Sequence, residues 1–322
     1  MSLFIIGSSN TDLVIYLDRI PKVGETLIGG KSDVVFGGKG ANQAIAAKRA
    51  GADIKFITQL GNDSFGENLK KHFKKEGLSQ RYILTDLHQP TGIAQIFVSN
   101  KGENSIAVAS GSNGTLTYKL LKPYLKEIVK TDLVLIQFEI PFETIERTID
   151  NCFENGVRIL VNPAPAINLT TKHLNKIWMI TPNESEAQVL SGISVNDEHS
   201  ALKAAQIILK KGVEHCIVTL GEKGSIWASQ AGAFHFIVPK VNAIDTTAAG
   251  DVFNGYLANG ITRNIALKKA IMIAHSAACL SVSVKGAQTS IPNMDEVLLF
   301  LKQNPIKLKK IGYDLESESF KK

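Results

Sequence analysis

The sequence predicts an α/β fold in which a mostly parallel central sheet is covered by helices on both faces, together with a small second β-sheet. Short apolar runs of strand length alternate with longer amphipathic stretches along most of the chain. Such alternation is typical of parallel sheets, because a crossover helix must connect each strand to the next. Two segments break the alternation and have the pattern of hairpins.

The expected strands are short apolar runs, and they span residues 3–7, 56–60, 133–138, 158–161, 178–180 and 216–220. The expected helices carry apolar residues at helical spacing. They span residues 41–50, 64–76, 142–155, 200–211, 250–260 and 266–284. In open parallel sheets, ligands bind beyond the carboxyl ends of the strands, so polar residues at these ends are the first candidates for a site.

The two hairpin segments, residues 12–36 and 91–109, would form the small sheet. A sheet with one apolar face must bury that face. We therefore expect this sheet to lie over a ligand cleft or over the same sheet of a second subunit in a dimer. The ranges 1–11, 37–90 and 110–302 are expected to form the main α/β domain. Residues 303–322 are interpreted as a C-terminal tail, with the basic run 307–310 exposed to solvent.

Bulk properties argue against several classes of protein. The 322 residues carry a formal charge of +6 with no basic stripe among aromatic residues, so no nucleic-acid partner is expected. No run approaches the roughly 18 apolar residues of a membrane-spanning helix, so no membrane partner is expected either. The three cysteines lie in apolar segments, which indicates buried thiols in a reducing compartment. The N-terminus has the pattern of a strand rather than a signal peptide, and we expect a cytoplasmic protein.

Glycines and polar residues gather at expected strand ends. The run Gly37-Gly-Lys-Gly-Ala-Asn42 leads into a helix, where glycines would let a ligand approach the backbone, although an ordinary glycine-rich turn is the alternative. No Ser or Thr follows the lysine, so the run is not a Walker A loop. Asn10 and Asp12 follow the first strand at spacing i, i+2, so both side chains face the same way and could bind sugar hydroxyls or form a turn. Glu139 ends another strand and needs water or a partner.

Asn183 and Glu186 allow two interpretations. Their spacing is that of a capping box, with Asn183 as the N-cap residue and Glu186 at the third helical position. The same residues could lie near phosphate or near Mg²⁺, which keeps several of its waters when bound. His275 by itself is interpreted as a structural histidine of a helix.

The strongest candidate for chemistry is the run Asp245-Thr-Thr-Ala-Ala-Gly-Asp251. Its small residues would leave the backbone N–H groups of Ala248, Ala249 and Gly250 free at the head of a helix, where the helix dipole favours an anion. A carboxylate at Asp251 in the first turn stabilises the helix. Beside an anion hole, it could also accept a hydroxyl proton during phosphoryl transfer. We therefore predict a small-molecule kinase with Asp251 as the catalytic base.

Taken together and in this order, these motifs resemble the ribokinase branch of the PfkB carbohydrate kinase family. Residues 37–44 resemble the first signature of the family, and residues 245–251 with 253–255 resemble the second. Residues 161–166 and 181–187 are similar to the ribokinase branch in particular. The resemblance covers residue 3 to about residue 300. It implies a three-layer α/β/α sandwich with a β-sheet lid that also builds a homodimer.

The resemblance also implies an activity, the ATP-dependent phosphorylation of D-ribose. Asp251 would deprotonate the 5-hydroxyl, and Ala248, Ala249 and Gly250 would form the anion hole. The sugar would be held by Asn10, Asp12, Gly38, Lys39, Gly40, Asn42 and Glu139. ATP and Mg²⁺ would be held by Asn183, Glu186, Thr219, Gly221, Gly224, Asn242, Gly250 and His275. K⁺, as a monovalent activator, would be bound by oxygen atoms of Asp245, Thr247, Ser281, Val284, Gly286 and Ser290.

Two alternatives stay open. Another pentose or a nucleoside, such as deoxyribose, could be the acceptor, although the amide of Asn10 favours a sugar with the additional hydroxyl because it would otherwise be left unpaired. A non-catalytic sugar or nucleotide sensor on the same fold would be expected to lose the base or the glycines. Asp251, Gly250 and Lys39 are all present in this sequence.

Overall fold

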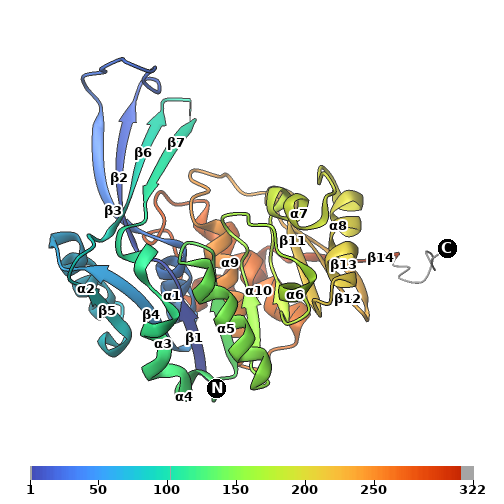
Figure 1. Cartoon of the computed structure of the whole chain (residues 1–322). Coiled ribbons are helices and arrows are strands. Elements are labelled where there is room, and N and C mark those ends of the chain that lie inside the picture. Colours follow the sequence, from blue (N-terminus) through green and yellow to red (C-terminus); the bar gives the residue numbers. More distant parts are fainter. Residues whose placement is uncertain (1, 102, 313–322) are drawn as a thin grey trace.

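A long twisted sheet runs through the centre of the molecule (Figure 1). The computed structural model describes residues 2–101 and 103–312, and ten strands within these ranges form the sheet. They are β1 (Ser2–Ile6), β4 (Asp53–Gly61), β5 (Ile83–Asp86), β8 (Leu133–Ile136), β9 (Arg158–Val161), β10 (Met179–Ile180), β11 (His215–Thr219), β12 (Ser225–Ser229), β13 (Gly232–Ile237) and β14 (Lys307–Ile311). Their order is β14-β13-β12-β11-β10-β9-β8-β1-β4-β5. Neighbours from β11 to β5 pair in parallel, whereas β12, β13 and β14 add antiparallel pairs at one edge.

Helices cover both faces of this sheet, because alternate residues of its buried strands point into two separate cores. Leu3 and Ile5 of β1 belong to one core, and Phe4 and Ile6 belong to the other. The first core is covered by α1 (Lys39–Arg49), α2 (Ser64–Lys75), α9 (Ala249–Thr262), α10 (Leu267–Ser281) and α11 (Met294–Gln303). The second is covered by α3 (Tyr118–Leu121), α4 (Leu125–Ile128), α5 (Phe142–Glu154), α6 (Thr171–Leu174), α7 (Glu184–Ser191) and α8 (Glu198–Lys210). The predicted α/β fold with a mostly parallel sheet between helical layers is confirmed.

Short 3₁₀ turns complete the main domain, at η1 (Gln80–Tyr82), η2 (Gly111–Thr115), η3 (Lys122–Tyr124) and η4 (Gly221–Lys223). Within residues 2–101 and 103–312, no helix has the length and apolar character needed to cross a membrane.

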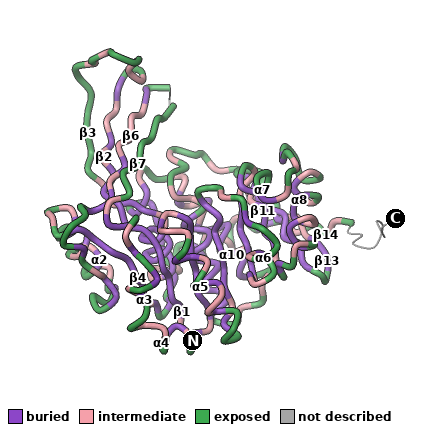
Figure 2. The backbone as a smooth tube through the Cα atoms, viewed as in Figure 1, coloured by how far each residue is buried: buried purple, intermediate pink, exposed green. Residues whose placement is uncertain are grey.

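A second sheet projects from the body of the molecule (Figure 1). It consists of β2 (Asn10–Leu17), β3 (Lys31–Gly37), β6 (Gly92–Ser99) and β7 (Asn104–Ala109). The antiparallel hairpins β2–β3 and β6–β7 are joined through a parallel pair between β2 and β6. Every residue of β7 is exposed, and Figure 2 shows the same exposure along its length. The expectation of a small sheet built from two hairpins is confirmed, and we call this sheet the lid.

The structure corrects two expectations about strands. Asn10 and Asp12 do not lie at the end of the first strand, because β1 ends at Ile6 and both residues belong to the lid strand β2. The basic run 307–310 is not a solvated tail, because it forms the edge strand β14 in antiparallel pairing with β13. An edge strand carries exposed lysines that discourage further pairing, so its sequence is as polar as that of a tail. Residues 313–322 of the expected tail lie outside the described residues, and the boundaries assigned to the domains stay a prediction.

Helices α1 and α9 approach each other closely, and this contact places the candidate site. A Cβ atom at Gly255 of α9 would lie 2.6 Å from the Cβ atom of Ala46 in α1. A Cβ atom at Gly40 would lie 2.6 Å from the backbone nitrogen of Ser8, so the start of α1 also touches the turn that follows β1. Gly40 and Gly255, which belong to the runs predicted to bind ligands, therefore also allow α1 to pack closely against α9 and against the turn after β1. They bring the starts of α1 and α9 together beside the end of β1.

Candidate active site

Asp251 lies in the first turn of α9 and is buried, with 6% of its surface exposed. Its two carboxylate oxygens accept hydrogen bonds from Asn42 Nδ2 and Gln43 Nε2 of α1, each at 2.9 Å. Burial raises the pKa of Asp251, and Lys39 and the two amides oppose that rise. The result is a fixed carboxylate that binds a proton more readily than an exposed one, as a general base requires.

Further amides hold the partners of Asp251 in place. Gln43 Nε2 also donates to Asn162 Oδ1 at 2.9 Å, and Gln43 Oε1 accepts from Gln137 Nε2 at 2.5 Å. Both ends of the Gln43 side chain are thus bonded, which fixes which end faces the carboxylate. Gln43 was not predicted as a site residue. Its local signals were its place directly after Asn42 and within the run 37–44.

Asn42 is the end of a longer chain of hydrogen bonds. Its Oδ1 accepts from Gln288 Nε2 at 3.0 Å, and Gln288 Oε1 is bonded to His72 Nε2 at 2.8 Å. The backbone of Gln288 belongs to the loop that follows α10, and its carbonyl accepts from Arg49 Nη1 at 2.8 Å. This loop is therefore connected to Asp251 through one amide side chain.

Three more charged side chains lie close enough to influence one another and Asp251. Glu139 Oε2 accepts from Ser8 Oγ at 2.5 Å and from the backbone N–H of Lys39 at 3.1 Å. Burial and, to a smaller extent, the nearby carboxylates of Glu139 and Asp251 together raise the pKa of Asp12 to about 7. Burial lowers the pKa of Lys39, but the carboxylates of Asp251, Glu139 and Glu186 outweigh this effect, and its pKa is raised overall. The ammonium group of Lys39 is therefore a cation among carboxylates.

The predicted sugar-binding residues are brought together by these contacts. Asn10 and Asp12 are both buried, and Asp12 Oδ1 has no hydrogen-bond partner within residues 2–101 and 103–312. A buried acceptor without a partner is costly, so this atom is suited to a hydroxyl of a ligand. Gly38 is the N-cap residue of α1 and has a φ of 89°.

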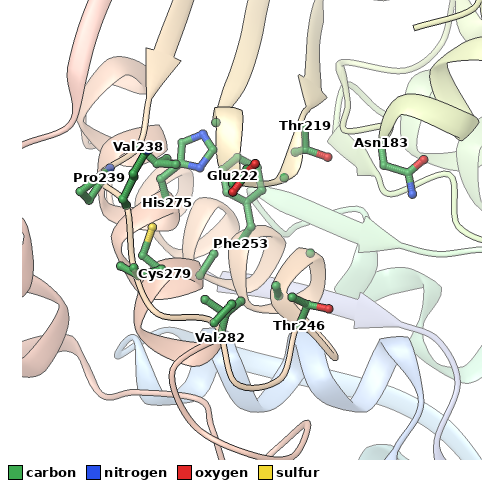
Figure 3. A pocket seen from close by; sticks show the side chains of 18 of the residues that line it. Asn183, Thr219, Glu222, Val238, Pro239, Thr246, Phe253, His275, Cys279 and Val282 are labelled. Atoms are coloured by element: carbon green, nitrogen blue, oxygen red, sulfur yellow. The ribbon is translucent and has the colours of Figure 1, made fainter. Parts of the chain in front are cut away.

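Two adjoining pockets open at the start of α9. The inner pocket has a volume of about 200 Å³ and is lined by Lys39, Asn162, Ala164, Thr181, Asn183, Glu186, Thr219, Thr246, Ala248, Ala249, Gly250, Asp251 and Asn254. The outer pocket, shown in Figure 3, has a volume of about 500 Å³. Both are lined by Asn183, Thr219, Thr246, Ala249 and Gly250. A ligand in the outer pocket could therefore extend past the start of α9 toward Asp251.

The start of α9 has the features of an anion-binding site, with one difference from the expectation. Ala248 has a φ of 61°, a left-handed conformation that costs a residue with a side chain about 1 kcal/mol. The backbone N–H groups of Ala248 and Gly250 have no partner in the described part of the chain, whereas that of Ala249 donates to Thr246 O at 3.3 Å. Gly250 faces open space, since a Cβ atom there would meet nothing within 4 Å. Two of the three expected donors are thus directly available.

Asn183 and Glu186 form the capping box predicted from their spacing, and their place near phosphate or Mg²⁺ stays a prediction. In this box, at the start of α7, Asn183 Oδ1 accepts from the Glu186 N–H and Glu186 Oε2 accepts from the Asn183 N–H, each at 2.9 Å. Both also line the inner pocket. Burial raises the pKa of Glu186, while Lys39 lowers it. The carboxylate is therefore close to a cation and able to order water or a hydrated metal ion.

The outer pocket is mostly apolar. Val238, Pro239, Phe253 and Val282 line it, and none of them was predicted from the sequence (Figure 3). His275 also lines it, as a buried side chain bonded to Ser225 Oγ at 2.7 Å. Burial lowers the pKa of His275 to about 3, so its ring is neutral near pH 7.

Other residues predicted for this pocket lie at the end of β11 and around the η4 turn. Thr219 is the last residue of β11, and Gly221 and Gly224 lie at the η4 turn; all three line the pocket, whereas Asn242 does not. The structure therefore places seven of the eight residues predicted to hold ATP and Mg²⁺ on the walls of the two pockets, and Asn242 lies between two lining residues.

Five of the six residues predicted to bind K⁺ lie on two loops that are bonded to each other, and Ser281 is the last residue of α10. Asp245 accepts from the backbone N–H groups of Thr247 and Gly286, each at 2.9 Å. The backbone N–H of Asp245 donates to Val282 O at 3.1 Å, which closes the contact at the end of α10. The Ser290 hydroxyl donates to Ala287 O at 2.9 Å in the same loop. A carboxylate, hydroxyls and loop carbonyls are the hard oxygen ligands that such a cation prefers, so these residues fit it.

A buried carboxylate beside a helix start, between a polar site and an apolar pocket, is an arrangement suited to a phosphotransferase. The chain matches the model of the pfkB family carbohydrate kinases over residues 1–294. It therefore belongs to the pfkB family of carbohydrate kinases, and the resemblance to its ribokinase branch is confirmed.

Three relatives define its place more closely. The chain is 42% identical over 301 residues to the ribokinase of Haemophilus influenzae, an alignment that covers 93% of this chain and 98% of the relative. It is 33% identical over 309 residues to the deoxyribokinase of Salmonella typhi, with 94% and 100% covered. The structure of Arabidopsis thaliana ribokinase complexed with ribose and ATP superposes with a TM-score of 0.87 at 29% identity, covering 93% of this chain and 98% of the other.

Proposed function

We propose that this protein phosphorylates D-ribose at O5, with ATP as the phosphoryl donor and with ribose 5-phosphate and ADP as products. The observation that carries this proposal is the position of Asp251. Its carboxylate is held by Asn42 and Gln43 at the start of α9, where free N–H groups adjoin the outer pocket. The similarity to ribokinases over nearly the whole chain supports ribose as the acceptor.

In the proposed reaction, an Asp251 oxygen accepts the proton of the 5-hydroxyl as the sugar oxygen bonds to the γ-phosphorus. The bond from that phosphorus to the β,γ-bridging oxygen breaks, and ADP leaves. The N–H groups of Ala248 and Gly250 donate to the oxygens that gain negative charge, and the ammonium of Lys39 lies close to the carboxylates on the sugar side. Asn10, Asp12, Asn42 and Glu139 would hold the other hydroxyls of the sugar.

The apolar outer pocket suits the flat base of ATP, since Val238, Phe253 and Val282 offer contact surface without polar atoms that would need partners. The triphosphate would run past Thr219 and Gly250 into the inner pocket. We assign Asn183 and Glu186 to the waters of Mg²⁺, which when bound offsets the charge of the phosphates. We assign the loops of Asp245 and Ser290 to K⁺.

The substrate assignment is tested by release of ADP with saturating ATP across pentoses, hexoses and nucleosides. We expect D-ribose to give the highest kcat/KM. Because one relative is a deoxyribokinase, 2-deoxyribose is the second candidate substrate. Equal turnover of the two sugars would contradict the proposal that ribose is the substrate. A site that bound sugar and ATP without any release of ADP would instead indicate a sensor. We also place the protein in the cytoplasm, which the free thiols of its three buried cysteines support.

We further propose a homodimer formed through the lid. The lid edge strand β7 exposes Ile106 and Val108, which keep 54% and 52% of their surface accessible and, being two residues apart, lie on the same face of the sheet. Neighbouring exposed apolar side chains on a projecting sheet are typical of an interface. We expect sedimentation equilibrium to give twice the chain mass for the native protein and the chain mass for Ile106→Asp. The exposed residue Val189 of α7, changed to Asp, is the matched control and should leave the dimer intact. A native protein that sediments as a monomer would contradict the proposal.

A further inference from the structure

Asn113 is a buried residue whose side-chain amide contacts the predicted sugar-binding residue Asn10. It lies outside the runs that resemble the family signatures. It lies in the η2 turn directly after the lid strand β7, and 2% of its surface is exposed. Its Oδ1 accepts from the backbone N–H of Ser9 at 2.9 Å. Its Nδ2 donates to Ser9 O at 3.0 Å and to Asn10 Oδ1 at 2.8 Å. One side chain thus connects the lid strand β2 to the turn that follows the lid.

These contacts fix the orientation of two amides in succession. A backbone N–H can only donate and a backbone carbonyl can only accept, so Ser9 determines which end of the Asn113 amide is oxygen and which is nitrogen. The nitrogen of Asn113 therefore faces Asn10, and the atom of Asn10 that meets it must be the oxygen. The NH₂ group of Asn10 is consequently directed away from Asn113, with both hydrogens available.

The space around Asn10 shows that this pairing depends on its neighbours. Asn10 pairs in register with Gly37 of β3 and Gly92 of β6. A Cβ atom at Gly92 would lie 2.3 Å from Asn113 Nδ2 and 2.4 Å from Asn10 Oδ1, so any larger residue would separate the two amides. Within residues 2–101 and 103–312, Asn10 Nδ2 makes no hydrogen bond, and neither does Asp12 Oδ1 two residues further along β2.

We propose that Asn113 is a positioning residue that sets the sugar specificity of the site by holding the Asn10 amide in one orientation. Held in this way, β2 presents one donor at Asn10 and one acceptor at Asp12, which is complementary to two neighbouring hydroxyls of a pentose. A sugar that lacks the hydroxyl facing Asn10 leaves a buried donor unpaired, and such mismatches discriminate strongly between substrates. This inference rests on the proposed function, because it takes ribose as the substrate.

The test compares ribose with 2-deoxyribose at saturating ATP in the native protein, Asn113→Asp, Asn10→Ala and the double variant. Asn113→Asp replaces the donor that faces Asn10 by an acceptor of the same shape, so the Asn10 amide must turn over or lose its partner. We expect KM for ribose to rise about 10- to 100-fold, with little change in KM for ATP. The ratio of kcat/KM for ribose to that for 2-deoxyribose should fall toward one.

Asn10→Ala should lower the same ratio, and Asn113→Asp should lower it no further in the Asn10→Ala background, because the two residues act through one contact. A role of Asn113 in folding alone would reduce kcat/KM for both sugars equally and leave the ratio unchanged, which would overturn the proposal. If circular dichroism shows that Asn113→Asp does not fold, the test rests on Asn10→Ala. A native ratio of kcat/KM for ribose to that for 2-deoxyribose in Asn10→Ala then refutes the inference. A native protein that does not phosphorylate ribose refutes the proposed function instead. One that phosphorylates ribose without preferring it to 2-deoxyribose refutes only the inference.

Discussion

The sugar side and the nucleotide side of the site are built from different groups. On the sugar side, the carboxylates of Asp12 and Asp251 are buried, that of Glu139 is partly buried, and Asp251 is oriented by amides that are themselves bonded. On the nucleotide side, apolar side chains such as Val238, Phe253 and Val282 line the outer pocket (Figure 3), and the free N–H group of Gly250 lies at its edge.

This difference determines how each side can select its ligand. Bonded amides and carboxylates accept only hydroxyls that match their donors and acceptors, and a single altered atom leaves a buried group unpaired. For an apolar wall, the affinity for a ligand grows with the apolar surface that is buried, and ligands of similar size and shape are poorly discriminated. We therefore expect point substitutions to have large effects on the sugar side and small, graded effects on the nucleotide side.

The largest effect is expected at Asp251, where the two sides meet. Asp251→Asn preserves the shape of the side chain but removes the group that accepts the proton, so kcat should fall about 10³-fold or more while sugar binding measured by calorimetry is preserved. Asp150→Asn on the surface helix α5 is the control and should leave kcat unchanged. Retention of most of the activity by Asp251→Asn would refute its role as the base.

The next largest effect concerns stability on the sugar side. The raised pKa of Asp12 means that the folded protein binds a proton there more tightly than the unfolded chain, so its contribution is favourable below about pH 4 and is lost as the pH rises through about 7. Asp12→Asn should therefore be more stable than the native protein at pH 8, by roughly 1–4 kcal/mol, with the difference shrinking toward pH 5. Urea unfolding at both pH values measures this. A difference that is the same at pH 5 and pH 8 would contradict the shift.

Replacement of K⁺ should have a moderate effect, which should be confined to kcat for phosphoryl transfer. The loops of Asp245 and Gly286 are bonded to each other directly before the N–H groups of α9, so a cation there would fix the shape of the anion hole without touching the sugar. In buffer with tetramethylammonium in place of K⁺, we expect kcat to fall about tenfold or more, since loss of one fixed donor costs about 10²–10³-fold in other enzymes. KM for ribose should change little. Equal kcat values in the two buffers would contradict the proposed activation by K⁺.

The smallest effect is expected at the apolar wall. Val282→Ala removes two methyl groups from the outer pocket and should raise KM for ATP about two- to tenfold, on the basis of about 0.8 kcal/mol for each buried carbon. kcat and KM for ribose should stay close to the native values. A loss of kcat comparable to that of Asp251→Asn would show that the two sides do not differ as described.

Local features of the site were predictable because they depend on neighbouring residues. Glu186 is three residues after Asn183, and this spacing alone predicted the capping box that the structure contains. The free N–H groups at the start of α9 likewise follow from the small residues that precede Asp251. Asn10 and Asp12 were correctly expected to face the same way, because alternation within a strand is local.

Contacts between distant segments were not predictable in this way. Gln43 bonds to Asp251 across 208 residues, and Asn113 bonds to Ser9 across 104. The first contact exists because α1 packs tightly on α9 at Gly255, and the second because the lid returns to the main domain beside the end of β1. Neither arrangement leaves a pattern in a single segment of sequence.

The sequence by itself determined the class of fold and predicted the start of α9 as the candidate site and Asp251 as its proposed base, because strand periodicity, helix caps and small-residue runs act over a few residues. Only the tertiary structure decided that Asn10 belongs to the lid, that residues 307–311 form an edge strand, and that buried amides orient the groups facing the sugar. Strand pairing and amide orientation depend on which distant donor meets which acceptor, and that choice is made only when the helices and sheets pack together.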